Sequence, residues 1–285
     1  MERILVLLSI LILALSNVSF RWPLNNPVLT STYGESRADH FHDGMDFVST
    51  DNRVFPVKEG KLLYAWNRSL FPLENYWGGG NYKIVKHDEE IISVYMHLQD
   101  GEKLEPEYTE NEAVGYAGNT GRSYGSHIHF TILNQKIKES INPFSVMPQF
   151  KDEKKPEIKY FYIKINDRYV RINENSNIRL TSHYPMLVEI SDSASGNERL
   201  GIYKIKVNFN DKDVLDVLFD EIKLSGHDYT VSGRGFYDLY DPAGYYKISG
   251  INYREGLNTF VVTVSDFSGN ISERKFDINV NLDIH

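Results

Sequence analysis

The chain alternates short apolar runs with polar and glycine-rich turns, and no long stretch repeats its apolar residues with the period of an amphipathic helix. The apolar runs are rich in branched and aromatic residues, which favour β-strands. We therefore expect a mainly β protein. Strands are predicted at residues 57–65, 82–86, 91–97 and 127–133, and further along at 159–165, 186–190, 202–209, 259–264 and 276–280.

A charged, proline-ended stretch at residues 149–156 has no apolar periodicity, so we expect it to be a linker between two domains. A chain of 285 residues is long enough for two ordinary hydrophobic cores. The predicted domains are residues 21–148 and 157–285. Within the second, the stretch 256–270 ends in an Asp-x-x-Gly-Asn turn. This stretch resembles the last hairpin of a bacterial immunoglobulin-like or fibronectin-like β-sandwich.

Two histidines, His127 and His129, open a predicted strand that follows a glycine-rich loop. Side chains alternate along a strand, so both imidazoles are expected on one face, where they can address the same metal ion. Upstream, His42 and Asp46 are four residues apart in a His-x-Gly-x-Asp motif, and a third motif, Tyr-x-His-Leu, contains His97. Neutral imidazole and carboxylate ligands around an ion with an open position are typical of a hydrolytic zinc site.

In chain order, His-x-Gly-x-Asp, Tyr-x-His-Leu and the glycine-rich loop followed by His-x-His-Phe resemble the motifs of the lysostaphin-type zinc endopeptidases of bacterial cell walls, and the resemblance covers roughly residues 30–148. It implies an antiparallel β-sheet peptidase domain with a narrow groove that holds one zinc ion. The implied substrate is the peptide cross-links of peptidoglycan. The roles that the resemblance implies are zinc ligation by His42, Asp46 and His129, general base catalysis by His127, and a position near the developing oxyanion, as partner of the base, for His97.

Alternation also predicts which side chains of the strand at 91–97 share a face. It places Tyr95 and His97 on one face, and Met96 and Leu98 on the other. The apolar side chains are then expected to anchor the strand while the histidine faces the groove.

Several neighbouring features have plainer interpretations. Asp43 is not expected to be a ligand, because only Asp46 has the four-residue spacing from His42. Thr131 stands where members of the family usually carry Glu, and it is not expected to touch the metal. The aromatic stretch at residues 64–77 is either a groove wall that stacks on substrate or a packed loop.

Composition narrows the range of partners and ligands. A net charge of −8 leaves no basic stripe, so nucleic acid is not an expected partner. The absence of cysteine excludes thiolate zinc ligands and disulfides. In the second domain, Asp192 and Asp266 are interpreted as ordinary turn residues, with calcium binding between strands as the alternative.

The first residues indicate export. An apolar run at residues 4–15 follows Arg3 and is too short to cross a bilayer comfortably as a helix, which is typical of a signal peptide. We expect residues 1–16 to be removed, which leaves no stable membrane span, and we predict a periplasmic protein. A secreted protein, or an uncleaved membrane anchor over residues 4–20, is the alternative.

These features together predict an exported zinc metalloendopeptidase that hydrolyses peptide cross-links of peptidoglycan during cell-wall remodelling. The alternative from a different class is a non-catalytic wall-binding or regulatory module that uses the same groove. A third interpretation gives the main role to the C-terminal domain, which would dock partner proteins such as a regulatory protein, or position the enzyme, with catalysis subordinate.

Overall fold

The computed structural model describes residues 20–283, apart from residues 88–89, 102, 138, 167, 195 and 197. The predicted signal peptide at residues 1–16 lies outside the described residues. The prediction of a mainly β protein is confirmed, because the helical segments of the described chain are a short α-helix, α1 (Phe236–Leu239), and a 3-10 helix (Pro143–Ser145). Within this part of the chain, no helix combines the length and the apolar character that a membrane crossing needs.

The N-terminal half is built on an antiparallel sheet. The strands of this half are β1 (Val28–Ser31), β2 (Met45–Val48), β3 (Arg53–Val54), β4 (Gly60–Trp66), β5 (Asn81–Lys86), β6 (Ile91–Leu98), β7 (Glu107–Tyr108), β8 (Gly115–Tyr116), β9 (Ile128–Asn134) and β10 (Glu139–Ile141). β3 and β8 form a separate two-stranded sheet, and the other strands belong to the main sheet. β6 and β9 pair at the centre, and β5 and β4 continue the sheet beyond β6. On the other side of β9, β2 pairs with its first residues and β10 with its last. This arrangement brings the segment before β2 against the start of β9.

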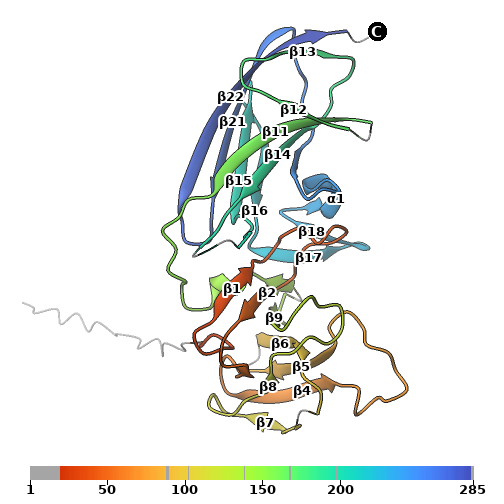
Figure 1. Cartoon of the computed structure of the whole chain (residues 1–285), viewed down its shortest axis with the longest axis vertical. Helices are drawn as coiled ribbons and strands as arrows, with labels where there is room; N and C mark the ends of the chain where they lie inside the picture. The colour runs from red at the N-terminus through yellow and green to blue at the C-terminus, as the bar shows by residue number, and fades with distance from the viewer. Residues whose placement is uncertain are drawn as a thin grey trace, which may run out of the picture.

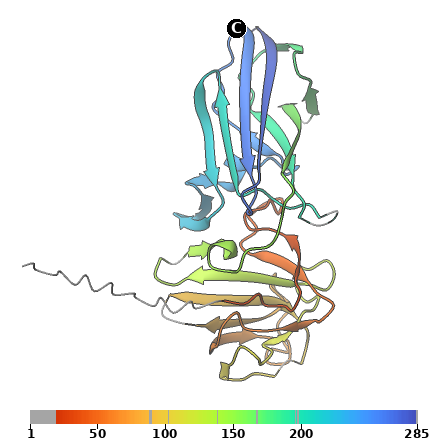
Figure 2. The same ribbon diagram turned by 90° about the vertical axis from the view of Figure 1, so that its left-hand side faces the viewer.

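In the C-terminal half, two sheets pack face to face, and we call them the C-terminal sandwich. The strands of this half are β11 (Glu157–Ile165), β12 (Arg168–Ile172), β13 (Asn177–Leu180), β14 (Met186–Ser191), β15 (Lys204–Phe209), β16 (Lys212–Leu218), β17 (Glu221–Ser225), β18 (Asp228–Val231), β19 (Arg234–Gly235), β20 (Tyr246–Ile248), β21 (Gly256–Ser265) and β22 (Ile271–Leu282). One sheet has the order β12-β11-β14-β20 and the other β13-β22-β21-β15-β16. Phe161 of the first sheet stacks on Phe276 of the second, with ring centroids 4.1 Å apart. Figure 2 shows the sandwich above the N-terminal sheet.

Strands of the C-terminal half extend the N-terminal sheet. β17 pairs antiparallel with β10, with Ser140 opposite Ile222, and β18 and β19 continue from β17. We call β17 and β18 the C-terminal hairpin; with α1 it lies between the sandwich and the N-terminal sheet (Figure 1). The pairing covers the edge of β10, whose backbone groups would otherwise need water or another partner. The prediction of two domains did not include this shared sheet.

Side chains close the same junction. The buried Asn142 donates from Nδ2 to the Phe219 carbonyl at 2.8 Å. The Phe219 ring packs directly on Gly34, where a Cβ would collide with it and where φ is +81°, so glycine is the residue that fits. Phe41 and Phe236 meet edge to face with centroids 5.3 Å apart. The two halves therefore share buried apolar contacts as well as a sheet.

Candidate functional site

Three of the predicted residues bring one ligand atom each to a common point. His42 Nε2 lies 3.1 Å from Asp46 Oδ1 and 3.0 Å from His129 Nδ1, and the last two atoms are 3.0 Å apart. Bonds of about 2.0–2.2 Å to a tetrahedral zinc ion place its ligand atoms roughly 3.3 Å from one another. The observed triangle therefore has nearly the size that such an ion requires, and the three residues could hold a metal ion.

Strand pairing and a close backbone approach assemble this triangle. Asp46 on β2 lies directly opposite His129 on β9, and His42 belongs to the segment just before β2. Gly44, between the two upstream ligands, has no room for a side chain. A Cβ there would lie 2.5 Å from the Phe130 carbonyl oxygen and 2.7 Å from His129 Nε2. The glycine of the His-x-Gly-x-Asp motif thus lets the ligand segment press against β9.

Hydrogen bonds to the second ring nitrogen orient both histidine ligands. His42 Nδ1 lies 2.7 Å from the Thr32 carbonyl, which can only accept, so Nδ1 carries the proton and Nε2 keeps its lone pair. His129 Nε2 lies 3.0 Å from Thr131 Oγ1 and 3.2 Å from Asp43 Oδ1. These contacts leave Nδ1 of His129 as its ligand atom.

The charges around the triangle favour a cation. Burial alone raises the pKa of Asp46, but the neighbouring His42 and His129 lower it well below its usual range. Burial lowers the pKa of His129, and the carboxylates of Asp43 and Asp46 outweigh it, so that the pKa rises to about 9. Arg37 donates from Nη2 to Asp46 Oδ2 at 3.0 Å, which leaves Oδ1 turned toward the histidines.

The two remaining predicted histidines lie beside the triangle. The rings of His97 and His127 are 4.8 Å apart, and His127 Nε2 lies 3.8 Å from Asp46 Oδ1. Nδ1 of His127 bonds the Gly125 carbonyl at 2.9 Å and Nδ1 of His97 bonds the Thr120 carbonyl at 2.8 Å, so each ring keeps a lone pair on Nε2. Burial lowers the pKa of His97 to about 4, which makes this ring neutral at neutral pH. The structure thus brings all five predicted residues together.

The predicted faces of β6 are wrong at its end. Tyr95 packs against Phe130 on the buried face, with ring centroids 5.7 Å apart, whereas His97 lines the groove on the opposite face. Met96, directly opposite His129, also lines the groove. Regular alternation fails because His97 has a φ of 63° and the register between β5 and β6 shifts near it. Irregularities of this type re-aim side chains beside active sites.

Sequence reasoning missed the residues that support the ligands. Thr131 and Asp43 were not expected to be ligands, and the structure places both on the outer nitrogen of His129. No sequence pattern indicated a role for Thr32 or Arg37. The sequence did indicate the position of Thr131, because it is two residues beyond His129 on the same strand and therefore shares its face.

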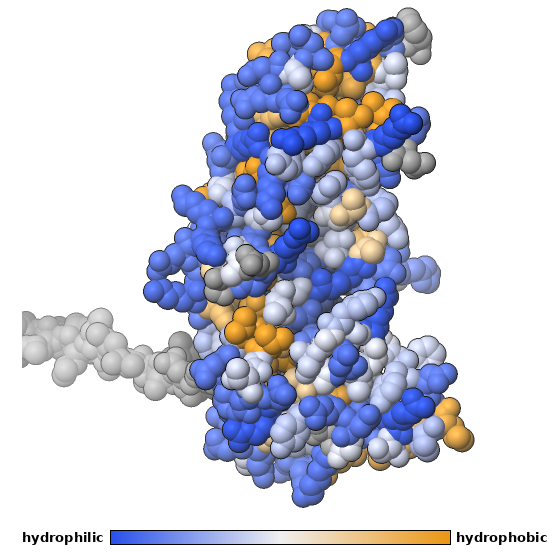
Figure 3. Space-filling model, viewed as in Figure 1, coloured by the Kyte–Doolittle hydropathy of each residue, from blue (hydrophilic) through white to orange (hydrophobic). Residues whose placement is uncertain are grey.

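A groove of about 1890 Å³ runs past the five residues, and both halves of the chain line it. Tyr124 lies on the N-terminal side, and Tyr229 of β18 and Tyr237 of α1 lie on the other. The last two are 61% and 60% exposed, and exposed aromatic rings beside a groove offer flat apolar surface to a ligand. The face of the molecule in Figure 3 is otherwise mostly hydrophilic, with hydrophobic residues in small groups.

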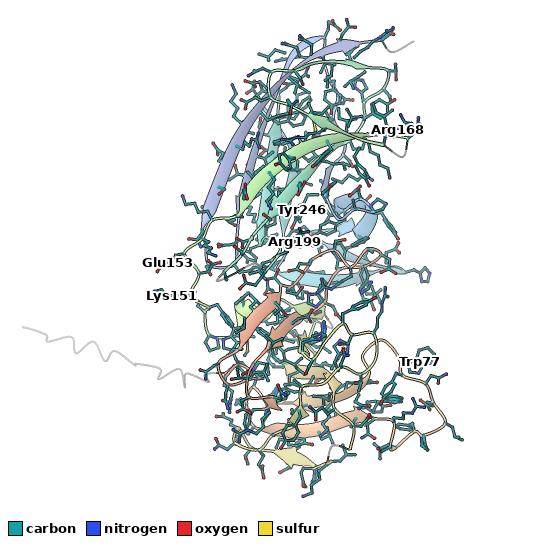
Figure 4. All side chains as sticks on the ribbon, viewed as in Figure 1. Trp77, Lys151, Glu153, Arg168, Arg199 and Tyr246 are labelled. Atoms are coloured by element: carbon teal, nitrogen blue, oxygen red, sulfur yellow. The ribbon has the colours of Figure 1, made fainter. Side chains whose placement is uncertain are left out.

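The aromatic stretch at residues 64–77 is packed in part, because three of its rings contact one another while Trp77 is 73% exposed. Trp66 stacks on Phe71 with an interplanar angle of 7°, and its ring lies 5.7 Å from that of Tyr76. None of these residues lines the groove. Figure 4 shows Trp77 on the loop that projects from the N-terminal half.

Fold and site together define a mainly β protein with a two-histidine, one-carboxylate metal site in an open groove. Residues 40–143 match the family model described as Peptidase family M23. The chain therefore contains an M23 peptidase domain, which confirms the lysostaphin-type resemblance of its motifs. A second family model matches residues 155–281.

Curated proteins with similar sequences include the Murein hydrolase activator NlpD of Escherichia coli (strain K12). It is 27% identical over 133 residues, which are 46% of this chain and 32% of that protein. The DD-carboxypeptidase/endopeptidase Mpg of Neisseria meningitidis serogroup B (strain ATCC BAA-335 / MC58) is 33% identical over 109 residues, 37% of this chain and 22% of that protein. This chain thus spans less than a third of the length of either relative. The solved catalytic domain of lysostaphin from Staphylococcus simulans is 25% identical, with 42% of this chain and 92% of that chain covered and a TM-score of 0.35.

Proposed function

We propose that this protein is an exported zinc metalloendopeptidase that hydrolyses the peptide cross-links of peptidoglycan. The observation that carries the proposal is the ligand triangle of His42, Asp46 and His129, with His97 and His127 beside it. The M23 domain supports it, as does similarity to a relative named as a carboxypeptidase and endopeptidase. Export rests on the sequence pattern of residues 1–16, and the periplasm is the proposed compartment.

Zinc fits the donor set of the site. Two imidazole nitrogens and one carboxylate oxygen are three ligands of the kind found in catalytic zinc sites, where a fourth position stays open. When bound, zinc supplies Lewis-acid polarisation of a peptide carbonyl and lowers the pKa of water. The chain itself must orient the substrate and move the proton.

His127 is the proposed general base. Its Nδ1–H is directed to the Gly125 carbonyl, so Nε2 is the acceptor, and this nitrogen faces Asp46 Oδ1 across 3.8 Å. An attacking water beside the ligand triangle would therefore lie within reach of Nε2. A positioned base of this kind typically contributes about 10²–10⁴-fold to the rate.

His97 is the proposed partner of His127. The resemblance places it near the developing oxyanion, a role that requires a hydrogen-bond donor. Because Nδ1–H of His97 bonds the Thr120 carbonyl, Nε2 is an acceptor in the neutral ring. In this state His97 orients the attacking water or accepts from a substrate N–H, and it donates to the oxyanion only after it gains a proton.

The C-terminal half supplies the second wall of the proposed substrate groove. β17 is fixed to the N-terminal sheet by its pairing with β10, so the C-terminal hairpin has a defined position beside the site. The groove of about 1890 Å³ exceeds the roughly 300–1,000 Å³ of ordinary small-molecule pockets. Its size suits a segment of cross-linked polymer, and Tyr229 and Tyr237 are placed to contact it.

Replacing both Tyr229 and Tyr237 with alanine is expected to raise KM for cross-linked peptidoglycan about tenfold, or about 1.4 kcal/mol, with kcat little changed. The rings contact the substrate away from the bond that breaks, so they contribute binding rather than chemistry. The measurement is the initial rate against substrate concentration. Tyr116→Ala, an exposed tyrosine outside the groove, is the matched control. Equal KM values in the double variant and the control would exclude this wall from substrate binding.

Replacing Thr131 with valine is expected to weaken zinc affinity about tenfold. Valine keeps the shape of threonine but removes the hydroxyl that bonds His129, and loss of such a supporting partner typically costs about 10–100-fold. Competition with a chromophoric chelator measures the affinity. Thr263→Val, which removes a hydroxyl bonded to Glu273 in the sandwich, controls for the general effect of the substitution. An unchanged affinity in Thr131→Val would show that Asp43 alone holds the ring.

The alternative is a groove that binds the cell wall without cleaving it. Similarity to a protein named Murein hydrolase activator favours this second candidate. The two candidates separate in one experiment, in which zinc-loaded protein of residues 17–285 is incubated with purified peptidoglycan and the muropeptides are analysed by mass spectrometry. Loss of cross-linked dimers supports the endopeptidase, and the masses of the new fragments identify the bond. Binding to insoluble peptidoglycan with an unchanged muropeptide profile supports the alternative.

A further inference from the structure

A second cluster of ligand-type side chains lies outside the groove, where the linker meets the C-terminal sandwich. Asp152 of the linker, Asp192 after β14 and Asp266 after β21 each bring a carboxylate oxygen within 4.8 Å of the others. Asp192 and Asp266 are 5% and 1% exposed. The three residues come from separate segments, so only the folded chain creates the cluster.

One oxygen of this cluster lacks a partner. Oδ1 of Asp192 is fully buried and accepts no hydrogen bond. By contrast, Asp266 accepts from the backbone N–H groups of Ser268 and Asn270, both at 2.8 Å, and from Asn270 Nδ2 at 2.7 Å. Among the described residues, no lysine or arginine forms an ion pair with Asp152, Asp192 or Asp266. The Asp192 carboxylate receives a backbone hydrogen bond from Ser193, but its buried Oδ1 has neither a donor nor a cation. An unsatisfied buried oxygen of this kind is destabilising, which points to a missing positive partner.

The electrostatics of the three carboxylates also favour a bound cation. Burial and then the nearby carboxylates of Asp266 and Asp152 raise the pKa of Asp192 to about 7. The pKa of Asp152 is raised as well, by burial and by Asp266 and Glu198. Three adjacent carboxylates repel one another unless a cation lies between them.

The linker is already held in this position by hydrogen bonds. Asn270 Nδ2 donates to the Asp152 carbonyl at 3.0 Å. The side chains of Lys151 and Glu153, on either side of Asp152 in the chain, are 87% and 80% exposed and lie at the outer edge of the junction in Figure 4. The carboxylate of Asp152 is thereby turned toward the sandwich.

We propose that Asp152, Asp192 and Asp266 bind a calcium ion that fastens the linker to the C-terminal sandwich. Calcium takes only oxygen ligands, at about 2.3–2.6 Å, so ligand atoms on opposite sides of it are roughly 5 Å apart, and the cluster has these dimensions. Zinc prefers the nitrogen donors of the histidine triangle, so the two ions sort to different sites.

The test is a titration of the zinc-loaded protein, residues 17–285, with CaCl₂ at pH 7.5 by isothermal calorimetry, with thermal unfolding in parallel. We expect one calcium ion per chain and a rise in Tm of roughly 5 °C when calcium exceeds Kd about 100-fold. MgCl₂ is expected to give a smaller shift, because magnesium demands stricter geometry. Asp192→Asn should abolish both responses. Asp211→Asn, in the exposed turn between β15 and β16, is the matched control.

A second variant and a second readout cover the risk that Asp192→Asn changes folding. Asp152→Asn, in the partly exposed linker, is expected to weaken calcium binding at least tenfold with an unchanged zinc content. Calcium should also slow tryptic cleavage after Lys151 and Lys154 in the wild type but not in the two variants. Absence of calcium binding in the wild type, or equal responses in the wild type and Asp192→Asn, overturns the proposal.

Discussion

Replacing His127 with alanine is expected to slow the hydrolysis of cross-linked muropeptides by about 10²–10⁴-fold while the zinc content stays unchanged. The reason is geometric. His127 Nε2 lies 3.8 Å from Asp46 Oδ1, farther than the 3.0–3.1 Å that separate the three ligand atoms, and close enough to take a proton from water beside them. The rate is measured from the loss of dimers by mass spectrometry, and the zinc content by elemental analysis of the same protein.

Two further variants serve as controls for the His127→Ala result. His129→Ala removes a ligand atom of the triangle, so it should lose both zinc and activity. His87→Ala should lose neither, because His87 bonds the Glu59 carbonyl and Ser93 and does not line the groove. A His127→Ala protein that binds zinc and retains more than a tenth of the wild-type rate would show that another group accepts the proton.

The motif residues were predictable because their geometry is local. Two histidines at i and i+2 share a face wherever the chain is a strand, and β9 includes His129 and begins just after His127. The His-x-Gly-x-Asp motif is local as well, because Gly44 between His42 and Asp46 permits the close approach to β9. Strand positions followed from apolar runs for the same reason, because burial on the sheet selects them residue by residue.

The supporting residues and the junction were not predictable because they depend on distant partners. The hydrogen bond from Arg37 to Asp46 exists only in the folded chain, where β2 and the preceding turn bring the two side chains together. His97 faces the groove because the alternation of side chains breaks at the end of β6. No local sequence pattern predicts this break. β17 was not among the predicted strands, and its partner β10 lies about 80 residues earlier in the chain.

Removing residues 149–285 is expected to unfold or aggregate the N-terminal half, although the motifs of the site all lie within it. The truncation uncovers the edge of β10 and takes Phe219 away from Gly34 and Phe236 away from Phe41. Loss of one buried Phe side chain costs about 3–5 kcal/mol, and whole domains are stable by only about 5–15 kcal/mol. Circular dichroism and size-exclusion chromatography of residues 21–148 beside residues 17–285 measure the effect.

The truncation removes both the C-terminal half and the covalent connection to it. A control variant whose linker is cut only after folding loses the connection but keeps the C-terminal half. A protease site in place of residues 153–155 leaves Asp152 intact and allows cleavage of the linker in the native protein. We expect the two fragments to elute together and to keep the zinc ion, because β10–β17 pairing and the buried phenylalanine contacts survive the cut. Soluble, monomeric residues 21–148 with the Tm of the full chain would instead mean that the shared sheet contributes little. In that case the C-terminal hairpin would be a movable wall of the groove rather than a fixed one.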